Sequence, residues 1–491
     1  MGSAIMMTAL PSSSVRETSS HRYNLTAPVA LLAFFITIPL LFSFEIAGLR
    51  LSPIRIYLLC AFLPTSLALF SRRAGPILAA DLTMAGFALW IVVSLLINDG
   101  LAQLPNSVMT AIELYGGYLL GRVLIRNPQD FGRMTSIYLG ILLILLPLVF
   151  IELLTGRIVL NEILGVTSLA DAGQRMGLWR SQSGFEHPIL YGLFCSSLAA
   201  TIFYVYRQSG LVTTLLRLGL VATMTFMSLS SAPLLSLVAQ VGLILWDRVT
   251  RGSWWLLIML ILLAYFAVAM ASNRPPLNVF LTYATFDPTT AWTRLEQWGY
   301  GTVAVMDHPI LGLGVGEKWT DIEKPLWLGD SVDSFWLLTA MRYGFVGFCL
   351  LAFSLLLLIG SVARERMTSK ALRDMRSGYL ISVVGIIFML ATVHIWGAVS
   401  IFIFFFIGSG AWLSDAARLE GPEATSRMTV KTDDLMARSA PNSRKTDLPT
   451  TRYAQDHQRY RGTPDLSFGA ASPEQRPHKL QARICGPGQK I

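Results

Sequence analysis

The 491-residue chain is poor in charge and in cysteine. Only 14% of its residues are charged, whereas 53% are hydrophobic. Its four cysteines form no CxxC pair and no metal-ligand spacing, so the sequence indicates neither a disulfide framework nor a zinc site. It also lacks a glycine-rich nucleotide loop, a DxD pair and a GxSxG elbow, which argues against nucleotide-dependent or serine-hydrolase chemistry. Nothing in it resembles a nucleic-acid-binding module, and we expect no nucleic-acid partner and no cofactor.

Long apolar runs dominate the sequence instead. A helix needs roughly 20 apolar residues to cross about 30 Å of hydrocarbon, and it satisfies its own backbone hydrogen bonds there. The runs therefore predict an all-α polytopic membrane protein with about twelve transmembrane helices. The predicted spans cover residues 29–49, 51–70, 77–97, 107–123, 135–154, 188–206, 211–228, 232–247, 254–272, 336–360, 379–395 and 397–414.

The charges of the short loops predict the orientation of these spans. One alternating set of loops is basic and contains Arg72, Arg73, Arg126, Arg133, Arg207, Arg248, Arg251, Arg364, Arg366, Lys370, Arg373 and Arg376. Such loops face the cytoplasm by the positive-inside rule, and parity then places both termini there. Polar residues 1–28 and 415–491 flank the helical domain at 29–414. The tail has few aromatic residues and is predicted to be disordered, because it cannot bury enough apolar surface to fold.

Two long polar segments, at about 155–187 and 273–335, fall on the opposite, extracytoplasmic side. They contain arginines where the positive-inside rule disfavours them, so each needs a local reason. Charged groups near a bilayer often line a path for an anionic substrate, and arginine binds phosphate oxygens in pairs. Arg175 and Arg180 are therefore candidates for binding an anionic substrate. The alternative is that they contact lipid headgroups or form salt bridges within their loop.

Acidic residues and a histidine near the span ends are candidates for a general base. Glu186 and His187 lie just before Pro188, at the end of a predicted span where water is partly excluded. There the pKa of a carboxyl or imidazole group can be shifted toward neutrality. Their other interpretation is a helix start, which favours proline in its first turn and an acidic residue near it. Asp330 and Asp333 precede the tenth span, where each is either a helix N-cap or, for Asp333 especially, a base.

The second polar segment has a pattern of its own. Residues 293–305 place apolar side chains at near-helical spacing, which predicts a short amphipathic helix that His308 and Pro309 end. Arg294 on this helix binds substrate or extends toward the membrane surface, and His308 is a further candidate. The GLGVG run from Gly312 forms a turn or presents backbone amides to a phosphate.

Three charged residues, Asp81, Glu113 and Arg122, fall inside predicted spans and need partners. Glu113 and Arg122 are separated by about 13 Å of helical rise, so they should not pair with each other.

Three segments resemble the bacterial O-antigen ligase and polysaccharide polymerase superfamily. The first begins at Arg175, reads RMGLWRSQSGFEHPILYG and is similar to the family pattern R-x-x-G-x-F-x-H-P. The second begins at Met227, reads MSLSSAPLLSL and is similar to the family's S-x-S-x-x-x-x-L helix start. The third begins at Arg294 and is similar to its R...W...HP..G.G.G stretch. The likeness covers the helical domain, about 29–414.

The resemblance implies a fold related to the lipid-dependent membrane glycosyltransferases, and a substrate glycan on a polyprenyl diphosphate. Ligases of this family have a His-Asn pair where this chain has Asp333 and Ser334, and the segment from Tyr115 resembles the exopolysaccharide polymerase branch. We therefore expect a metal-independent, inverting polymerase at the outer face of the bacterial inner membrane, with a ligase as the alternative. Besides the bilayer, its expected partners are a chain-length regulator and export proteins.

The resemblance also assigns roles to the site residues. Asp333 would act as the base, with His187 and then Glu186 as further candidates. Arg175, Arg180 and Arg294 would bind the diphosphate. A transporter or flippase is the alternative of another class, but the chain shows no repeated halves, which many such proteins have.

Overall fold

The computed structural model describes residues 26–39, 42–46, 49–166, 173–273, 279, 288–315, 324–329 and 331–420. Residues 1–25 and 421–491 lie outside this range, so the predicted disorder of the tail stays a prediction. Asp330 also lies outside the described residues.

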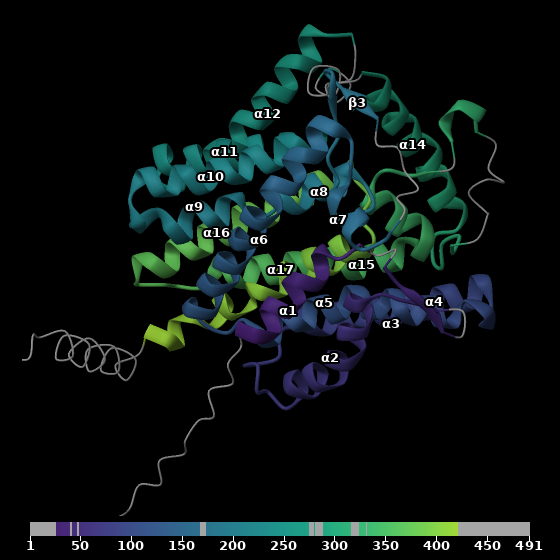
Figure 1. Ribbon diagram of the computed structural model, residues 1–491, viewed down its shortest axis with the longest axis horizontal. Coiled ribbons are helices and arrows are strands. Elements are labelled where there is room, and N and C mark those ends of the chain that lie inside the picture. The colour runs from purple at the N-terminus through teal and green to yellow at the C-terminus, as the bar shows by residue number, and fades with distance from the viewer. Residues whose placement is uncertain are drawn as a thin grey trace, which may run out of the picture. The chain divides into compact units, whose positions relative to one another are not determined.

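The described chain is mostly helical (Figure 1). The helices are α1 (Thr26–Thr37), α2 (Pro53–Phe70), α3 (Ala79–Asp99), α4 (Leu104–Ala111), the π-helical turn η2 (Ile112–Gly116), α5 (Gly117–Leu124), α6 (Pro128–Thr155), α7 (Val159–Ile163), α8 (Pro188–Ser196), α9 (Ala199–Tyr206), α10 (Leu211–Met227), α11 (Ser231–Thr250), α12 (Trp254–Ala271), α14 (Pro288–Asp307), α15 (Phe335–Arg364), α16 (Lys370–Leu390) and α17 (Gly397–Ser409). Short 3₁₀ turns cover Leu101–Gln103, Arg207–Ser209, Leu326–Leu328 and Ala411–Glu420. Two antiparallel pairs of short strands join β1 (Phe44–Ile46) to β2 (Leu49–Leu51) and β3 (Gln174–Arg175) to β4 (Leu178–Trp179).

Eight helical stretches among the described residues are long and apolar enough to cross a membrane. They are α2, α3, α6, α8 with α9, α11, α12, α15, and α17 with the turn after it. Helices α1 and α10 are shorter and apolar. The chain is therefore a mostly helical, multi-pass membrane protein. The count of twelve spans would also need α4–α5 and α16 to cross, and it stays a prediction.

The first predicted span, 29–49, is wrong beyond its first half. Helix α1 ends at Thr37, and β1 pairs with β2 where the span was expected to continue, with Glu45 opposite Arg50. The reason is Pro39, because a proline disfavours helical geometry in the residue before it and cannot donate a helical hydrogen bond. The prediction followed hydropathy alone and passed over this interruption.

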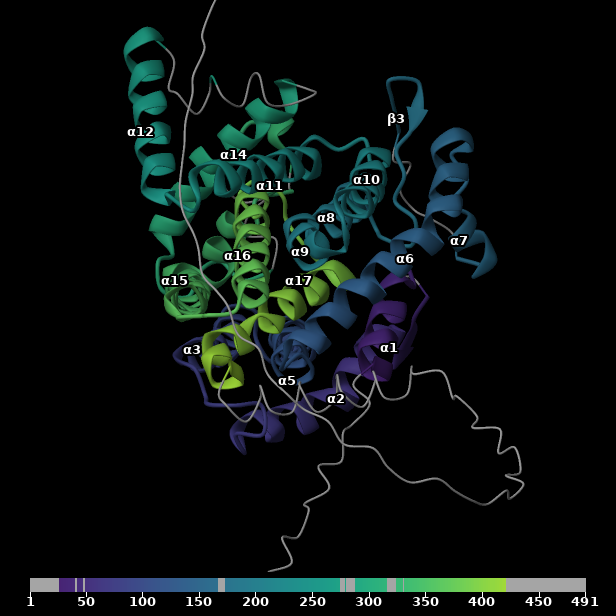
Figure 2. The same cartoon turned by 90° about the vertical axis from the view of Figure 1, so that its left-hand side faces the viewer.

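Helix α17 forms the core of the bundle, and Figure 2 shows it in the middle of the helices. All of its residues from Gly397 to Ser409 are buried. A helix that is apolar on every side is expected in such a place. It packs against α5, α8 and α1. A Cβ atom added at Gly121 would overlap the carbonyl oxygen of Phe405, and one at Gly408 would overlap that of Tyr118. Glycine thus lets the two backbones touch, as small residues do in membrane proteins.

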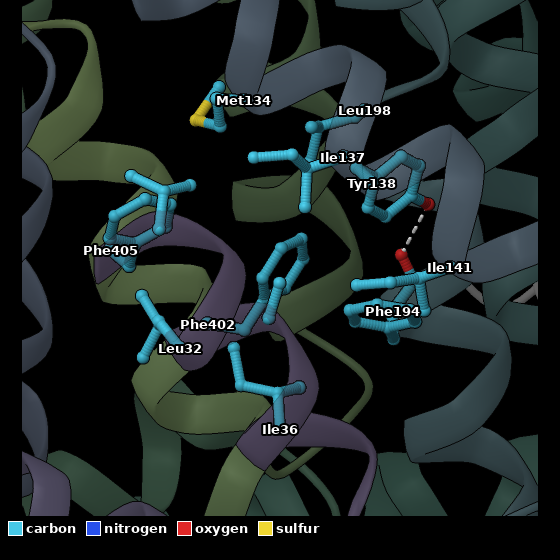
Figure 3. Close-up of a pocket in the computed structure, with 12 residues that line it drawn as sticks. Leu32, Ile36, Met134, Ile137, Tyr138, Ile141, Phe194, Leu198, Phe402 and Phe405 are labelled. Carbon is cyan, nitrogen blue, oxygen red and sulfur yellow. Dashed lines mark hydrogen bonds between the residues drawn. The ribbon is translucent and has the colours of Figure 1, made fainter. Parts of the chain in front are cut away.

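An apolar pocket lies where α1, α6, α8 and α17 meet (Figure 3). Leu32 and Ile36 of α1 face Tyr138 of α6 and the ring of Phe402 across it. The Tyr138 hydroxyl donates to the carbonyl oxygens of Phe194 and Cys195, at 2.8 and 2.7 Å. These carbonyls belong to the end of α8, where the helix is interrupted before α9. An interruption at this depth needs polar partners, because lipid supplies none.

Each of the three intramembrane charges identified in the sequence has a partner of opposite charge. Arg122 and Asp81 form an ion pair at 3.3 Å, and the hydroxyl of Tyr118 donates to the same carboxylate at 2.5 Å. Glu113 pairs instead with Arg55, at 2.7 Å. The prediction that Glu113 and Arg122 do not pair with each other is confirmed.

The basic loops that the sequence assigns to one side meet at one end of the helices. Arg126 donates to the carbonyl of Arg73 at 2.7 Å, and Arg207 pairs with Asp374 at 3.1 Å. Each contact joins two loops that are distant in the sequence, which agrees with the alternating pattern. Which side of the membrane this end faces is still a prediction.

The contact between α5 and α17 can be tested by adding a single methyl group. We expect Gly121→Ala to lower the melting temperature of the detergent-purified protein, because overpacking against a backbone costs about 1–3 kcal/mol or more. Gly132→Ala in α6 is the matched control, since a Cβ at this helical position has nothing within 4 Å. The control should gain about 0.5–1 kcal/mol from helix propensity. Equal melting temperatures for the two variants would contradict the close approach.

Candidate active site

The two candidate arginines of the first polar segment, Arg175 and Arg180, form hydrogen bonds to the turn between α10 and α11. Arg175 in β3 donates through Nη1 to the carbonyl of Leu229 at 2.9 Å. Arg180 donates through Nη2 to the hydroxyl of Ser230 at 3.0 Å. The backbone N–H of Ser181 also donates to the carbonyl of Met227, at 3.0 Å. The first two motifs that resemble the superfamily therefore touch each other in space.

A buried carboxylate fixes the loop that follows. Glu152 of α6 accepts hydrogen bonds from the backbone N–H groups of Gln182 and Ser183, at 2.8 and 2.9 Å. Ser183 has a φ of 55°, in the left-handed region that residues with a side chain rarely adopt. Such strain persists only when the surroundings hold it. Glu152 supplies that hold and so positions Glu186 and His187 a few residues further on.

His187 is the N-cap of α8, with Pro188 in the first turn, as one interpretation of the sequence predicted. Its Nδ1 accepts a hydrogen bond from the backbone N–H of Ile189 at 3.1 Å. A neutral imidazole that accepts at Nδ1 carries its proton on Nε2. Burial, with the nearby charges of Arg180 and Arg175, lowers the pKa of His187 to about 4. At neutral pH this ring is thus uncharged and acts as a hydrogen-bond donor at Nε2.

Glu186 is a buried carboxyl group, and neither of its oxygens has a hydrogen-bond partner among the described residues. Burial raises its pKa to about 7; the charge of Glu113 adds to the rise, and Arg55 opposes it. The group is therefore poised between its two protonation states near neutral pH. It also lies close enough to the Arg55–Glu113 ion pair to feel both charges.

The second polar segment contributes another ion pair. Arg294 of α14 donates through Nε to Asp333 at 3.3 Å, just before α15. Gln297 reinforces this junction by accepting from the backbone N–H of Asp333 at 3.0 Å and donating to the carbonyl of Ser331 at 2.8 Å. The N-cap of α15 is Ser334, whose hydroxyl accepts from the N–H of Leu337. Since Ser334 takes the capping role, the Asp333 carboxylate is left for its ion pair.

A series of ring contacts joins the two arginine-bearing segments through the loop between α16 and α17. The ring of His187 lies 6.5 Å from that of Trp396, measured between centroids, and Trp396 lies 5.6 Å from His394. His394 stacks in turn on Phe335, at 6.2 Å. The N–H of Phe335 also donates to the carbonyl of Val393 at 3.2 Å. His187 and Phe335, which are 148 residues apart in the sequence, thus belong to one site.

A cavity of about 200 Å³ lies beside these rings. Its polar lining comes from Arg55, Thr110, Glu113, Thr339, Arg342, Tyr343, His394, Trp396 and Ser400. Arg342 and His394 were not among the site residues predicted from the sequence. Two signals were available: Arg342 and His394 both fall inside predicted spans, His394 near the end of the span 379–395. Both are features that the membrane makes costly.

The glycine run after α14 serves the packing of α15. The N–H groups of Leu313 and Gly314 donate to the carbonyls of Met341 and Arg342, at 2.7 and 3.1 Å. The N–H of Val315 donates to the carboxylate of Asp99 at 3.0 Å. These amides are already engaged, so the turn interpretation holds for residues 312–315 and the phosphate interpretation is wrong there; Gly316 lies outside the described residues. As predicted, α14 ends before His308, whose side chain is exposed there.

The raised pKa of Glu186 predicts a pH-dependent stability. A carboxyl group with a higher pKa in the folded state than in the unfolded state binds more protons when folded, so its contribution to stability falls as pH rises from about 4.5 to about 7. Glu186→Gln removes this titration. The melting temperature of the variant relative to the parent protein should therefore increase between pH 4.5 and 7.5, measured by thermal unfolding in detergent.

Glu162→Gln is the control, since Glu162 is half exposed and pairs with Arg157 on the surface. A difference between Glu186→Gln and the parent protein that stays constant over this pH range would show that Glu186 is not a buried, titrating group.

No curated protein matches the chain significantly. Residues 216–352 match a family model described as O-antigen ligase. The matched segment includes the α10–α11 turn that holds Arg175 and Arg180, and it also includes Arg294, Asp333 and Arg342. The match supports the resemblance of the motifs to the O-antigen ligase and polysaccharide polymerase superfamily.

Proposed function

We propose that this protein is a polysaccharide polymerase, which joins oligosaccharide repeat units carried on a polyprenyl diphosphate at the outer face of the bacterial inner membrane. One observation carries the proposal: the turn between α10 and α11 in the matched domain holds Arg175 and Arg180 side by side, next to a histidine that stays neutral. This arrangement suits a ligand with several anionic oxygens.

The electrostatics of the two arginines support a diphosphate ligand. Burial, with the charge of Arg175, lowers the pKa of Arg180 to about 10, so that Arg180 is still cationic at neutral pH. The two positive charges disfavour each other, and an anion bound between them would relieve that cost. Arginine guanidinium groups form paired hydrogen bonds with phosphate oxygens. The Nε2–H of His187 would add an uncharged donor to the same group.

In the proposed reaction Asp333 removes the proton from an acceptor sugar hydroxyl. The resulting oxygen attacks the anomeric carbon of the donor, and the bond from that carbon to the diphosphate oxygen breaks. The diphosphate leaves on its lipid with the bonding electron pair, and Asp333 releases the proton afterwards. One displacement of this kind inverts the anomeric centre. Charge develops on the leaving oxygen, where fixed donors lower the barrier most.

Arg294 connects the base to the leaving group in this scheme. Its Nε is engaged by the Asp333 carboxylate, and the edge formed by its two terminal nitrogens is the one that pairs with phosphate oxygens. It would hold Asp333 in place and contribute to diphosphate binding. His187 has a different role from the base that the sequence suggested, because its proton sits on the nitrogen that faces away from Ile189.

A ligase that transfers the glycan to a lipid acceptor is the second candidate, favoured by the description of the matching family. The polymerase is preferred because Asp333 and Ser334 stand where family ligases have a His-Asn pair. The two functions differ in their products. A polymerase lengthens the glycan on its carrier lipid, whereas a ligase transfers the glycan to a different lipid without lengthening it.

Replacing the arginines with lysine tests the diphosphate site. Arg175→Lys, Arg180→Lys and Arg294→Lys keep the charge but lose the planar fork of donors. We expect each to slow polymer formation about 10²- to 10³-fold, the usual cost of removing one donor that stabilises the transition state. Chain length on gels and the amount of single lipid-linked units in a polymer-deficient strain give the readout.

Arg157→Lys is the matched control, because Arg157 is exposed and pairs with Glu162. Full-length polymer from all three site variants would rule out diphosphate binding by these arginines. If the protein were a transporter, inactive variants would accumulate single lipid-linked units on the inner leaflet. Inactive variants of a polymerase would accumulate them on the outer leaflet.

The proposed orientation can be tested by labelling. Met176 lies in the β3–β4 turn and is 66% exposed, while Ser209 is exposed at the opposite, basic end. In a background without the four native cysteines, we expect Met176→Cys to react with a membrane-impermeant maleimide on intact spheroplasts. Ser209→Cys should react only after permeabilisation. Labelling of Ser209→Cys on intact spheroplasts, with Met176→Cys labelled only after permeabilisation, would place the arginines on the cytoplasmic side. That result would contradict the proposed reaction.

A further inference from the structure

The cavity beside the ring series has a charge imbalance that the proposed reaction does not use. It lies between α2, the helix interrupted by η2, α15 and the α16–α17 loop. Two of its charged groups, Arg55 and Glu113, neutralise each other at 2.7 Å. Arg342 also lines it, and no carboxylate of the described residues lies within ion-pair distance of Arg342. The cavity wall therefore has an excess positive charge.

The backbone at Arg342 is held firmly in place. Its carbonyl accepts hydrogen bonds from the N–H of Gly314 and the hydroxyl of Ser94, at 3.1 and 3.3 Å. Two residues later α15 breaks at Gly344, which has a φ of 71° and no room for a side chain. Because three separate parts of the chain fix this point, the guanidinium is attached to a rigid support. A binding group gains from such preorganisation, since less freedom is lost when the ligand arrives.

His394 offers the cavity an acceptor. Its ring is stacked between Phe335 and Trp396, so its orientation is set, and its Nδ1 is buried without a hydrogen-bond partner among the described residues. Burial and the charge of Arg342 lower the pKa of His394 to about 3, which keeps it neutral. A neutral, unpartnered ring nitrogen next to a cation can accept a hydrogen bond from a ligand hydroxyl.

The size of the cavity limits what it can hold. Its 200 Å³ correspond to the liquid volume of roughly seven water molecules, and sites for drug-sized ligands span about 300–1,000 Å³. One sugar ring fits this space, but a whole repeat unit does not. Trp396 is 39% exposed and offers the apolar side of its ring to such a ligand.

We propose that this cavity binds one acidic sugar of the acceptor glycan, with Arg342 pairing with the sugar carboxylate, His394 accepting from a ring hydroxyl and Trp396 packing against the ring. The naming of this sugar as the acceptor rests on the proposed function; the binding of an acidic sugar does not. The position suits an acceptor, because Phe335 lines the cavity two residues after the base Asp333.

Binding of two matched probes to the purified full-length protein tests this inference. Methyl β-glucuronide and methyl β-glucoside differ only in a carboxylate against a hydroxymethyl group. We expect the parent protein to bind the glucuronide at least about tenfold more tightly, measured by ligand-induced shifts in melting temperature. Arg342→Gln should weaken glucuronide binding about 10- to 100-fold, the usual range for a lost hydrogen bond to a charged group, and leave glucoside binding unchanged.

Arg366→Gln is the control, since it removes one positive charge from an exposed loop. Arg342→Lys serves as a second variant if the glutamine variant does not fold, and it should bind the glucuronide with intermediate affinity. Inorganic pyrophosphate separates this cavity from the carrier-lipid site. Its binding should survive Arg342→Gln and weaken in Arg180→Gln.

Two results would overturn the inference. Equal affinities for glucuronide and glucoside in the parent protein would show that no carboxylate site exists. Loss of pyrophosphate binding in Arg342→Gln, without glucuronide selectivity in the parent protein, would assign Arg342 to the phosphates of the carrier lipid. Failure of the proposed function looks different: the three arginine-to-lysine variants would make full-length polymer while glucuronide binding persisted.

Discussion

The backbone contact between α5 and α17 is the constraint from which the rest of the structure follows. Gly121 and Gly408 leave no space between the two helices, and α17 is buried along its whole length. A helix held so tightly fixes the loop that leads into it. That loop carries His394 and Trp396, so the most rigid part of the bundle sets the position of the rings that join the two halves of the site.

The charged groups of the protein fall into two kinds: those paired with an opposite charge inside the bundle, and those at its mouth that repel each other or stay neutral. The intramembrane pairs, such as Asp81 with Arg122, are closed within the protein, as expected where water is absent. At the mouth, Arg175 and Arg180 lie close enough to repel each other, while His187 and His394 are kept neutral by burial and by the arginines near them. The result is a cationic surface with uncharged hydrogen-bonding groups beside it, a combination suited to anionic glycan substrates.

The approximate positions of the helices could be predicted from the apolar runs, because a helix that crosses hydrocarbon must consist mainly of apolar residues. The end of the first span could not be predicted in this way, since Pro39 acts locally and a hydropathy average does not register it.

Four site residues were predicted because they are charged and lie near the end of a span: Arg175, Arg180, Arg294 and Asp333. The structure places them in two clusters that aromatic rings join. The joining residues were missed, because the approach of His394 to Phe335 depends on contacts between distant segments. The sequence offered Asp330 and Asp333 as caps of the tenth span, whereas Ser334 caps α15. Neighbouring polar residues can each cap a helix, and only the geometry shows which one does.

Helix α12 differs from the others in having no buried residue, and it stands apart from α11 and α16 in Figure 2. Its 18 residues extend about 27 Å, slightly less than the roughly 30 Å of an average hydrocarbon layer. Since the described part of the chain buries none of its residues, bilayer thickness contributes strongly to its tilt. Hydrophobic mismatch favours an upright helix in a locally thinned bilayer. The lipid composition of the membrane thereby becomes part of what determines the orientation of α12.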